Sequence, residues 1–206
     1  MSELSRQAHW QGVYTTKGER EVSWFQESPA ISLELIKAAG APPRTSIVDV
    51  GGGASRLPDA LLEAGYEDVT VLDVSEAALA ASRSRLGARA NRVHWVASDV
   101  TTWEPSRHFD VWHDRAVLHF LTEAADRTAY VQRVHKALRS GGTVIIGTFA
   151  LDGPEKCSGL PVVRYDAGSL GKTLGGSFAL VESRRHEHAT PWGSTQRFQF
   201  SVFRRK

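Results

Sequence analysis

Three consecutive glycines follow one short apolar segment, which contains Asp49, and Asp73 ends a second one. This arrangement suits a bound nucleoside. Residues 47–50 are apolar apart from Asp49, and glycines occupy 51–53. Because glycine has no Cβ, a small ligand can lie directly against the backbone there. A second apolar run, 69–72, ends at Asp73. We expect both features at the carboxyl edge of a parallel sheet, where open α/β sheets bind ligands.

The spacing of the glycines argues against a dinucleotide. The fingerprint Gly-x-Gly-x-x-Gly uses its third glycine for close helix packing beside a pyrophosphate. Counted from Gly51, that position is Arg56. Asp49, two residues before the first glycine, would repel a pyrophosphate but tolerate a cationic ligand. S-adenosylmethionine (SAM), a nucleoside with a sulfonium and no phosphate, has that character.

Two motifs carry a family resemblance. Residues 49–53 have the pattern Asp-x-Gly-x-Gly, and 73–79 have the pattern Asp-x-Ser-x-x-Ala-Leu. Over about residues 45–150 the chain resembles the class I SAM-dependent methyltransferases. The resemblance implies that SAM is the cofactor, that Asp73 binds its ribose and that Asp99 binds its adenine amino group. The SAM-binding residues that it implies are Asp49, Gly51, Gly52, Gly53, Asp73, Val74, Asp99 and Val100.

The same residues also have a purely structural interpretation. A glycine turn is often only a tight strand-helix connection, and an acid after a strand commonly caps the next helix. Asp73 and Ser75 could both cap a helix that begins near Glu76. Three acid-ended strands in succession favour the ligand-binding interpretation.

The segment 112–120 follows the fourth predicted strand, where the resembling family commonly places its acceptor-facing motif. We predict Asp114 as the residue that orients the nucleophile or accepts its proton, with His113 as the second candidate. A base is needed only if the acceptor arrives protonated. Arg115 could pair with Asp114 or bind an acceptor carboxylate through two hydrogen bonds. His119 could face either the site or the core.

Four aromatic residues precede the first predicted strand: Trp10, Tyr14, Trp24 and Phe25. We predict a lid that packs on the sulfonium by cation-π attraction, or alternatively a seal on the edge of the sheet. This part of the chain resembles small bacterial methyltransferases, which are distantly related to the protein-lysine methyltransferases that modify citrate synthase or elongation factor.

The order of apolar segments predicts an α/β fold with a three-layer, Rossmann-like sheet of seven strands, mostly parallel with an antiparallel C-terminal strand. The expected strands are 46–50, 69–73, 92–97, one starting at 109, 143–149, 178–182 and 196–203. The expected helices are 31–40, 57–64, 76–86 and 124–138. We expect one domain, 1–206, consisting of an N-terminal helical lid (1–44), a SAM-binding core (45–150) and acceptor-side elements (151–206).

Composition narrows the partners and the location. The net charge of +2 is too balanced to indicate nucleic acid. No apolar run approaches the roughly 20 residues that span a bilayer, and the N-terminus lacks a signal-peptide apolar region. Cys157 is the only cysteine, which excludes an intrachain disulfide. Residues 186–190 lack the second histidine of His-Glu-x-x-His, so we predict no metal. We expect a cytoplasmic protein without a membrane partner.

These observations predict an enzyme that transfers methyl from SAM to an N, O or S acceptor, with a small molecule favoured over the alternative, a protein lysine. A non-catalytic protein that binds SAM or a nucleoside is the alternative of another class. The sequence indicates no oligomeric state.

Overall fold

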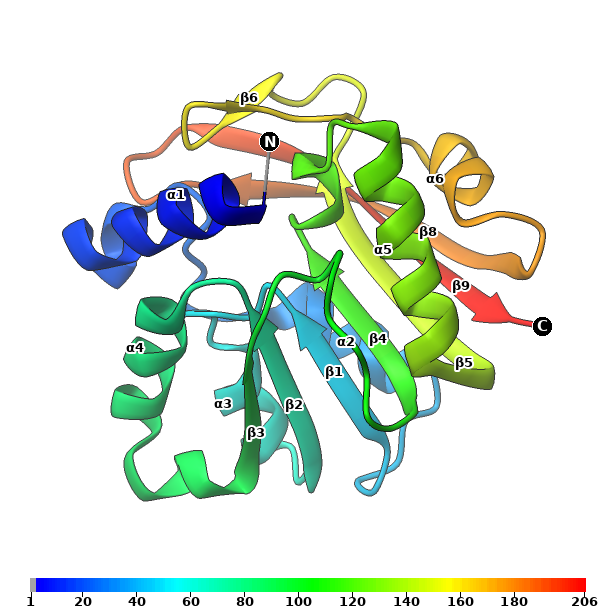
Figure 1. Cartoon of the computed structure of the whole chain (residues 1–206), viewed down its shortest axis with the longest axis horizontal. Helices are drawn as coiled ribbons and strands as arrows, with labels where there is room; N and C mark the ends of the chain where they lie inside the picture. Colours follow the sequence, from blue (N-terminus) through cyan, green and yellow to red (C-terminus); the bar gives the residue numbers. More distant parts are fainter. Residues whose placement is uncertain (1–2) are drawn as a thin grey trace.

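The computed structural model describes residues 3–206, which fold around a seven-stranded β-sheet (Figure 1). Its strands are β1 (Ser46–Val50), β2 (Asp68–Asp73), β3 (Val93–Ala97), β4 (Phe109–Arg115), β5 (Leu138–Phe149), β8 (Phe178–Ala189) and β9 (Thr195–Arg205). The strand order is β3-β2-β1-β4-β5-β9-β8. Neighbours from β3 to β5 pair in parallel, whereas β9 runs antiparallel to both β5 and β8. The predicted fold class is therefore confirmed.

The remaining elements are mostly helical. The α-helices are α1 (Glu3–Thr16), α2 (Ala30–Ala38), α3 (Leu57–Glu63), α4 (Glu76–Leu86), α5 (Ala124–Ala137) and α6 (Ala167–Leu174). Single-turn or short 3-10 helices are η1 (Glu19–Glu21), η2 (Gly87–Arg92) and η3 (Leu118–Phe120). A small hairpin is formed by β6 (Lys156–Cys157) and β7 (Leu160–Pro161).

The main sheet lies between two helical layers. Residues of α2, α3 and α4 pack on one face, and residues of α5 and α6 pack on the other. Every residue of β1 is buried, as expected for a parallel strand that is covered on both faces. In contrast, α1 lies across the ends of the strands, above α4 in the view of Figure 1.

Neighbouring side chains of β4 point to opposite layers, because the side chains of a strand alternate. His113 contacts Ser32 of α2, with 2.9 Å between Nε2 and Oγ. Trp112 donates its indole N–H to the hydroxyl of Tyr130 in α5 at 2.9 Å. Asp114 accepts a hydrogen bond from the same hydroxyl at 2.6 Å. The two candidate catalytic residues therefore belong to different sides of the sheet.

Several elements differ from the sequence-based expectation, which did not include α6, β6 or β7. Helix α1 lies in the segment expected to form a helical lid, but its bounds were not predicted, because its sequence is largely polar and Arg6 is its only buried residue. Strand β5 begins at Leu138 rather than at residue 143, since α5 passes into it without a loop. Strand β8 extends to Ala189 rather than ending at residue 182. As an edge strand it pairs only with β9, so its polar second half needs no apolar pattern.

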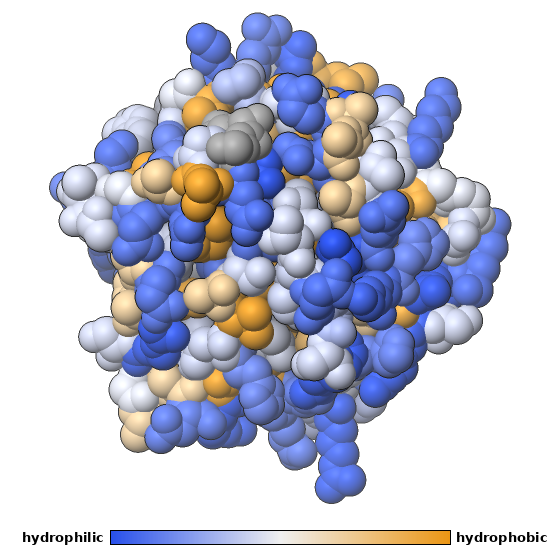
Figure 2. All heavy atoms as spheres, viewed as in Figure 1, coloured by the Kyte–Doolittle hydropathy of each residue, from blue (hydrophilic) through white to orange (hydrophobic). Residues whose placement is uncertain are grey.

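Large hydrophobic side chains are exposed only at scattered positions among the described residues: Leu4, Leu151, Leu180, Val181 and Trp192. Figure 2 shows the same character on one face, where hydrophobic residues are interspersed with hydrophilic ones. Within residues 3–206, no helix has both the length and the apolar character needed to cross a bilayer.

Candidate functional site

A cavity of about 880 Å³, counted to its open mouth, lies at the carboxyl ends of β1, β2 and β4, beneath α1. We call one part of its lining the glycine-loop wall, which contains Val50, Gly51, Leu72, Asp73, Val74, Ser98, Asp99, Val100 and Val117. We call the other part the aromatic wall, which contains Trp10, Tyr14, Trp24, Arg115, Phe120, Phe149, Cys157, Gln196 and Phe198.

The glycine loop lies too close to its neighbours for side chains. Gly51 has φ +68°, and a Cβ there would lie 2.0 Å from Cγ2 of Val117. A Cβ on Gly53 would lie 2.5 Å from Oδ2 of Asp73. The expectation of bare backbone at this edge of the sheet therefore has a geometric basis, because any larger residue would clash.

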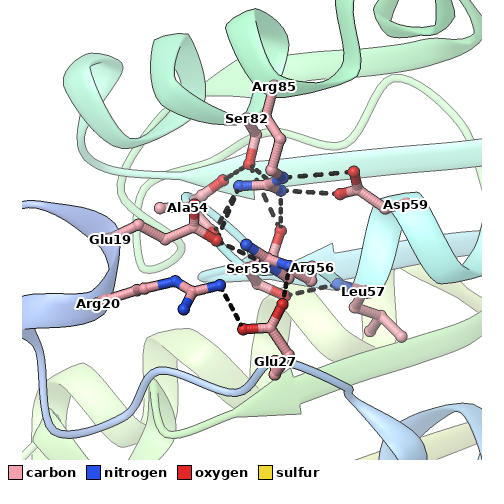
Figure 3. Close-up of polar contacts among 11 residues, drawn as sticks. Glu19, Arg20, Glu27, Ala54, Ser55, Arg56, Leu57, Asp59, Ser82 and Arg85 are labelled. Carbon is pink, nitrogen blue, oxygen red and sulfur yellow. Dashed lines mark hydrogen bonds and ion pairs between the residues drawn. The ribbon is translucent and has the colours of Figure 1, made fainter. Parts of the chain in front are cut away.

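Figure 3 shows that helix α4 fixes the far end of this loop. Arg85 donates to the carbonyl oxygens of Ala54 and Ser55, at 3.1 and 2.6 Å, and also pairs with Asp59 at 2.8 Å. Ser82 donates its hydroxyl to the carbonyl of Gly53 at 2.6 Å. Three consecutive loop carbonyls thus accept hydrogen bonds from one helix, which holds the loop in a single conformation.

Arg56, which stands where a dinucleotide fingerprint requires glycine, has a different role in the same network (Figure 3). Its guanidinium pairs with Glu19 at 2.9 Å and with Glu27 at 2.6 Å. These ion pairs tie the segment between α1 and α2 to the start of α3. The N-terminal part of the chain is therefore anchored directly beside the glycine loop.

Asp49 is buried behind the glycine loop. Its Oδ1 lies 2.7 Å from Nδ1 of His113, whose other ring nitrogen contacts Ser32. Its Oδ2 is buried, and no residue in the described part of the chain forms a hydrogen bond with it. A buried carboxylate oxygen without a partner is costly, which makes it a candidate for a ligand's N–H donor.

Asp73 lines the cavity and also has a structural function. Its Oδ1 accepts a hydrogen bond from the backbone N–H of Ser75 at 2.8 Å, and Ser75 in turn caps α4. Burial raises the pKa of the Asp73 carboxyl to about 7, although hydrogen bonds from Ser75 and Gly53 oppose this shift. The ligand-binding and capping interpretations are thus compatible, because the helix cap leaves the carboxylate in the wall.

Asp99 lies at the opposite end of the glycine-loop wall, where Arg6 of α1 reaches it. Arg6 donates from Nε to Oδ2 of Asp99 at 2.7 Å, and from Nη1 to Asp126 at 2.8 Å. Thr101 donates both its backbone N–H and its hydroxyl to the other oxygen of Asp99. These bonds hold the pKa of Asp99 below its usual value despite burial. Asp99 is therefore a fixed, ionised acceptor in the cavity.

The structure places Asp114 away from the cavity, contrary to the expectation that it faces an acceptor. Its side chain is fully buried and accepts hydrogen bonds from the backbone N–H groups of Val117 and Leu118, at 2.8 and 3.0 Å. Together with Tyr130, these donors occupy both carboxylate oxygens. Asp114 therefore shapes the turn after β4, in which Ala116 adopts φ +72°.

The other acceptor-side predictions divide into two groups. Trp10, Tyr14, Trp24 and Arg115 all lie in the aromatic wall, where the indole N–H of Trp24 donates to the Tyr14 hydroxyl at 3.0 Å. His113 is turned toward Ser32 and Asp49, behind the glycine loop.

Phe25 and His119 were also predicted at the acceptor side, and neither lines this cavity. The ring of Phe25 packs under the guanidinium of Arg56, outside the aromatic wall. His119 is buried against Phe149, and its Nδ1 accepts the Phe149 backbone N–H at 3.3 Å. Burial lowers the pKa of His119 to about 3, so it is a neutral core residue.

Several lining residues were not predicted, among them Arg6, Phe120, Phe149, Gln196 and Phe198. One sequence signal was available for Arg6. It precedes Trp10 and Tyr14 at intervals of four residues, which places all three on one face of a helix. Gln196 and Phe198 lie on β9, far in sequence from Phe120 and Phe149, and they reach the cavity because β9 inserts beside β5.

The chain is similar to one protein family and to several curated proteins. Residues 47–142 match the family described as a methyltransferase domain. An eEF1A lysine and N-terminal methyltransferase from Bos taurus is 28% identical over 142 residues, which cover 66% of this chain and 19% of that protein. The corresponding Homo sapiens protein is 25% identical over 142 residues, with the same coverage. The chain thus spans only about a fifth of the length of these curated relatives.

Solved structures match over nearly the whole chain. The 1,6-didemethyltoxoflavin-N1-methyltransferase of Burkholderia thailandensis, with bound 1,6-didemethyltoxoflavin and S-adenosylhomocysteine (SAH), is 24% identical with a TM-score of 0.76. That alignment covers 100% of this chain and 91% of the other. The N-methyltransferase NodS of Bradyrhizobium japonicum WM9, in complex with SAH, is 18% identical with a TM-score of 0.70, and the alignment covers 95% and 97% of the two chains. Together with the glycine loop, the acid-ended strands and the strand order, these matches show that the chain has the fold of SAM-dependent methyltransferases and that residues 47–142 are similar to a methyltransferase domain.

Proposed function

We propose that the chain transfers the methyl group of SAM to an N, O or S atom of a small molecule that binds against the aromatic wall. One observation carries this choice of acceptor. Within the described residues, that wall contains no Asp or Glu, and its one charged group is the guanidinium of Arg115. A cationic side chain such as lysine is disfavoured beside an unneutralised cation, whereas aromatic faces suit a planar acceptor.

The glycine-loop wall suits the donor. The unpartnered Oδ2 of Asp49 is a fitting acceptor for the ammonium of the methionine part, because charge-assisted bonds of this kind are strong. We propose that the chain that carries this ammonium lies against the backbone of Gly51, which lines the cavity, whereas Asp49, Gly52 and Gly53 are not among the lining residues. The remaining donor contacts that we propose are Asp73 for the ribose hydroxyls, and Asp99, Val74 and Val100 for adenine.

The chemistry requires alignment more than proton transfer. SAM supplies an electrophilic methyl group on its sulfonium when bound. A lone pair of the acceptor forms the new bond to the methyl carbon, while the electron pair of the breaking carbon–sulfur bond remains on sulfur and SAH is released. The wall residues position the acceptor and exclude water, and effects of this kind supply a large part of such rate enhancements.

The aromatic wall contains a tyrosine hydroxyl (Tyr14) and a thiol (Cys157), and neither group can act as a base near neutral pH. Burial raises the pKa of the Tyr14 hydroxyl and of the Cys157 thiol, so both stay protonated. Asp114 and His113 lie outside this wall. We therefore infer that the reacting atom of the acceptor arrives with a free lone pair or releases its proton to solvent.

A protein-lysine acceptor is the second candidate, and the match to eEF1A lysine and N-terminal methyltransferases favours it. The test is incubation of the purified protein with methyl-labelled SAM and host lysate, followed by separation of protein and small-molecule fractions. We expect the label in the small-molecule fraction and its loss with Asp73→Ala. Label in a protein band would instead support the lysine acceptor. SAH binding without any labelled product would identify a non-catalytic SAM-binding protein.

We further propose that the described residues act as one domain, in which 1–44 form the lid, 45–150 the donor site and 151–206 part of the acceptor side. Met1 and Ser2 lie outside the described residues. Support comes from α1 and β9, which both contribute to the same cavity. The cytoplasmic location expected from the sequence stays a prediction.

A further inference from the structure

The guanidinium of Arg115 lacks most of the hydrogen bonds that a buried cation requires. Its Nη1 donates to the backbone carbonyl of Trp24 at 3.0 Å. Its Nε and Nη2 are shielded from solvent, and no residue between 3 and 206 accepts a hydrogen bond from either. These two nitrogens lie along one edge of the planar group, and this edge can donate two parallel hydrogen bonds.

The surroundings of Arg115 do not neutralise it. The guanidinium lies 4.8 Å from the ring centre of Phe198, so an aromatic face covers one side. Burial lowers the pKa of Arg115 to about 10, and the nearby Cys157, Tyr14 and Asp49 oppose this shift. The group therefore remains a cation at neutral pH, in a wall that contains no described carboxylate.

Other poorly exposed arginines of the chain have acidic partners. Arg6 pairs with Asp99 and Asp126, and Arg85 pairs with Asp59. A buried charge without a partner costs several kcal/mol, so Arg115 in this state opposes folding rather than assisting it. A group that destabilises the protein while lining the cavity points to a role toward a ligand.

A second polar side chain in the same wall also lacks a hydrogen-bond partner for one of its buried atoms. Gln196, on β9, has a buried Oε1 with no hydrogen-bond partner within the described residues. Both Arg115 and Gln196 line the cavity. The cavity thus offers two donors on a cation and, separately, one neutral acceptor.

We propose that Arg115 binds a carboxylate of a ligand in this cavity through Nε and Nη2, with the ring of Phe198 as a flat support. This inference rests on the proposed function, because two molecules of that reaction could bring the carboxylate. One is the methionine part of the donor, and the other is an acidic small-molecule acceptor. The interaction is the same in both cases, and the experiment distinguishes them.

The first arm tests the donor. Calorimetry compares SAM with decarboxylated SAM, which differs only in lacking the carboxylate, on the wild type and on Arg115→Gln. If the donor supplies the carboxylate, the substitution should weaken SAM binding at least about tenfold, or 1.4 kcal/mol. Binding of decarboxylated SAM should then remain unchanged.

The second arm tests the acceptor, with the protein saturated with SAH. Benzoate is titrated against its neutral analogue benzamide, because the wall is aromatic and the two probes differ mainly in charge. If the acceptor supplies the carboxylate, benzoate should bind the wild type and lose at least about tenfold in affinity with Arg115→Gln. The affinity for benzamide should be the same in the wild type and in Arg115→Gln.

Arg115→Lys keeps the charge but lacks the two parallel N–H donors of the guanidinium. Its affinity for the carboxylate ligand should therefore lie between those of Arg115→Gln and the wild type. The matched control is Arg185→Gln on β8, which removes an exposed guanidinium that pairs with Asp152. This variant should bind both ligands with unchanged affinity. Thermal unfolding should show that Arg115→Gln is at least as stable as the wild type, since an unpaired buried charge is removed.

The proposal is overturned if Arg115→Gln affects SAM and decarboxylated SAM equally and benzoate does not bind. It is also overturned if the variant unfolds at a much lower temperature and Arg115→Lys behaves alike, because the residue would then be structural. All these readouts are binding or stability measurements. A protein that binds the carboxylate but methylates nothing would therefore contradict the proposed function alone.

Discussion

Arg6 and Asp99 form an ion pair of 2.7 Å that joins helix α1 to the loop after β3, across the mouth of the cavity. Both side chains are almost fully shielded from solvent. Because the second partner of Arg6 is Asp126 at the start of α5, one guanidinium holds three separate segments together. The position of the lid is therefore tied to the residue that we propose for adenine binding.

Loss of this pair should loosen the lid. With Arg6→Gln, we expect faster amide hydrogen exchange in residues 6–16 and SAH affinity reduced by about three- to tenfold, since local opening competes with binding. Hydrogen exchange followed by mass spectrometry and calorimetry measure the two effects. The control Arg20→Gln removes an exposed ion pair with Glu27 and should leave both unchanged. Unaltered exchange in Arg6→Gln would show that α1 is held by other contacts.

Ligand binding should depend on the protonation of Asp73. Burial raises the pKa of this carboxyl to about 7 in the free protein, and ribose hydroxyls donate best to its ionised form. The complex therefore favours loss of the proton, so SAH affinity should rise between about pH 6 and pH 7 and level off above. Calorimetry in buffers of different ionisation enthalpy should detect proton release on binding at pH 6 and little at pH 8.

Asp73→Asn provides the comparison for this pH dependence. Its side chain does not titrate, so its SAH affinity should be weaker at pH 8 and flat across the same range. Asp73→Ala should lose at least about tenfold, or 1.4 kcal/mol, because it removes charge-assisted bonds. If wild-type affinity were also flat from pH 6 to 8, the carboxyl would not contact the ribose.

The glycine loop permits a matched test of backbone approach. Gly51→Ala places a methyl group 2.0 Å from Val117 in the cavity wall, whereas Gly65→Ala has open space around the new methyl. Both positions have positive φ, +68° and +88°, so both variants carry the same type of backbone strain. We expect SAH binding to be lost only in Gly51→Ala, although both proteins unfold at lower temperature. Equal binding by the two variants would refute the close-approach argument.

Asp114 should matter for stability and for the shape of the turn after β4. Asp114→Asn places an amide N–H₂ against the backbone donors of Val117 or Leu118, or against the Tyr130 hydroxyl. We expect a loss of about 1–3 kcal/mol in the free energy of unfolding, measured by urea denaturation. Tyr130→Phe removes one of these three hydrogen bonds and also the acceptor of the buried Trp112 indole N–H, so it should cost a similar amount. An unchanged urea midpoint for Asp114→Asn would show that these bonds contribute nothing net.

The sequence could predict that Gly51, Asp73 and Asp99 meet at one cavity, because the information for this half is local. Asp49, the glycines and Asp73 lie within single strand-turn-helix units, and the turn itself requires their types. The acceptor half could not be predicted in the same way. Phe198 and Gln196 reach the cavity only through the insertion of β9 beside β5, and no short-range pattern specifies that pairing.

The prediction for Asp114 failed for a different reason. Titratable residues at the end of a strand alternate between faces, so only every second one can point toward a given helix layer. Asp114 accepts a hydrogen bond from Tyr130 on α5, whereas Arg115 lies on the same side of the sheet as His113 and donates to the carbonyl of Trp24. The register of β4 decides which member of this segment lines the cavity, and that member is Arg115.

Helix α1 touches both halves of the cavity, through Arg6 at one end and Tyr14 at the other. Because one helix lines both the part of the cavity that we propose for SAM and the part that we propose for the acceptor, a displacement of α1 would widen both parts at once. If the proposed reaction occurs in this cavity, we expect movement of α1 to accompany product release.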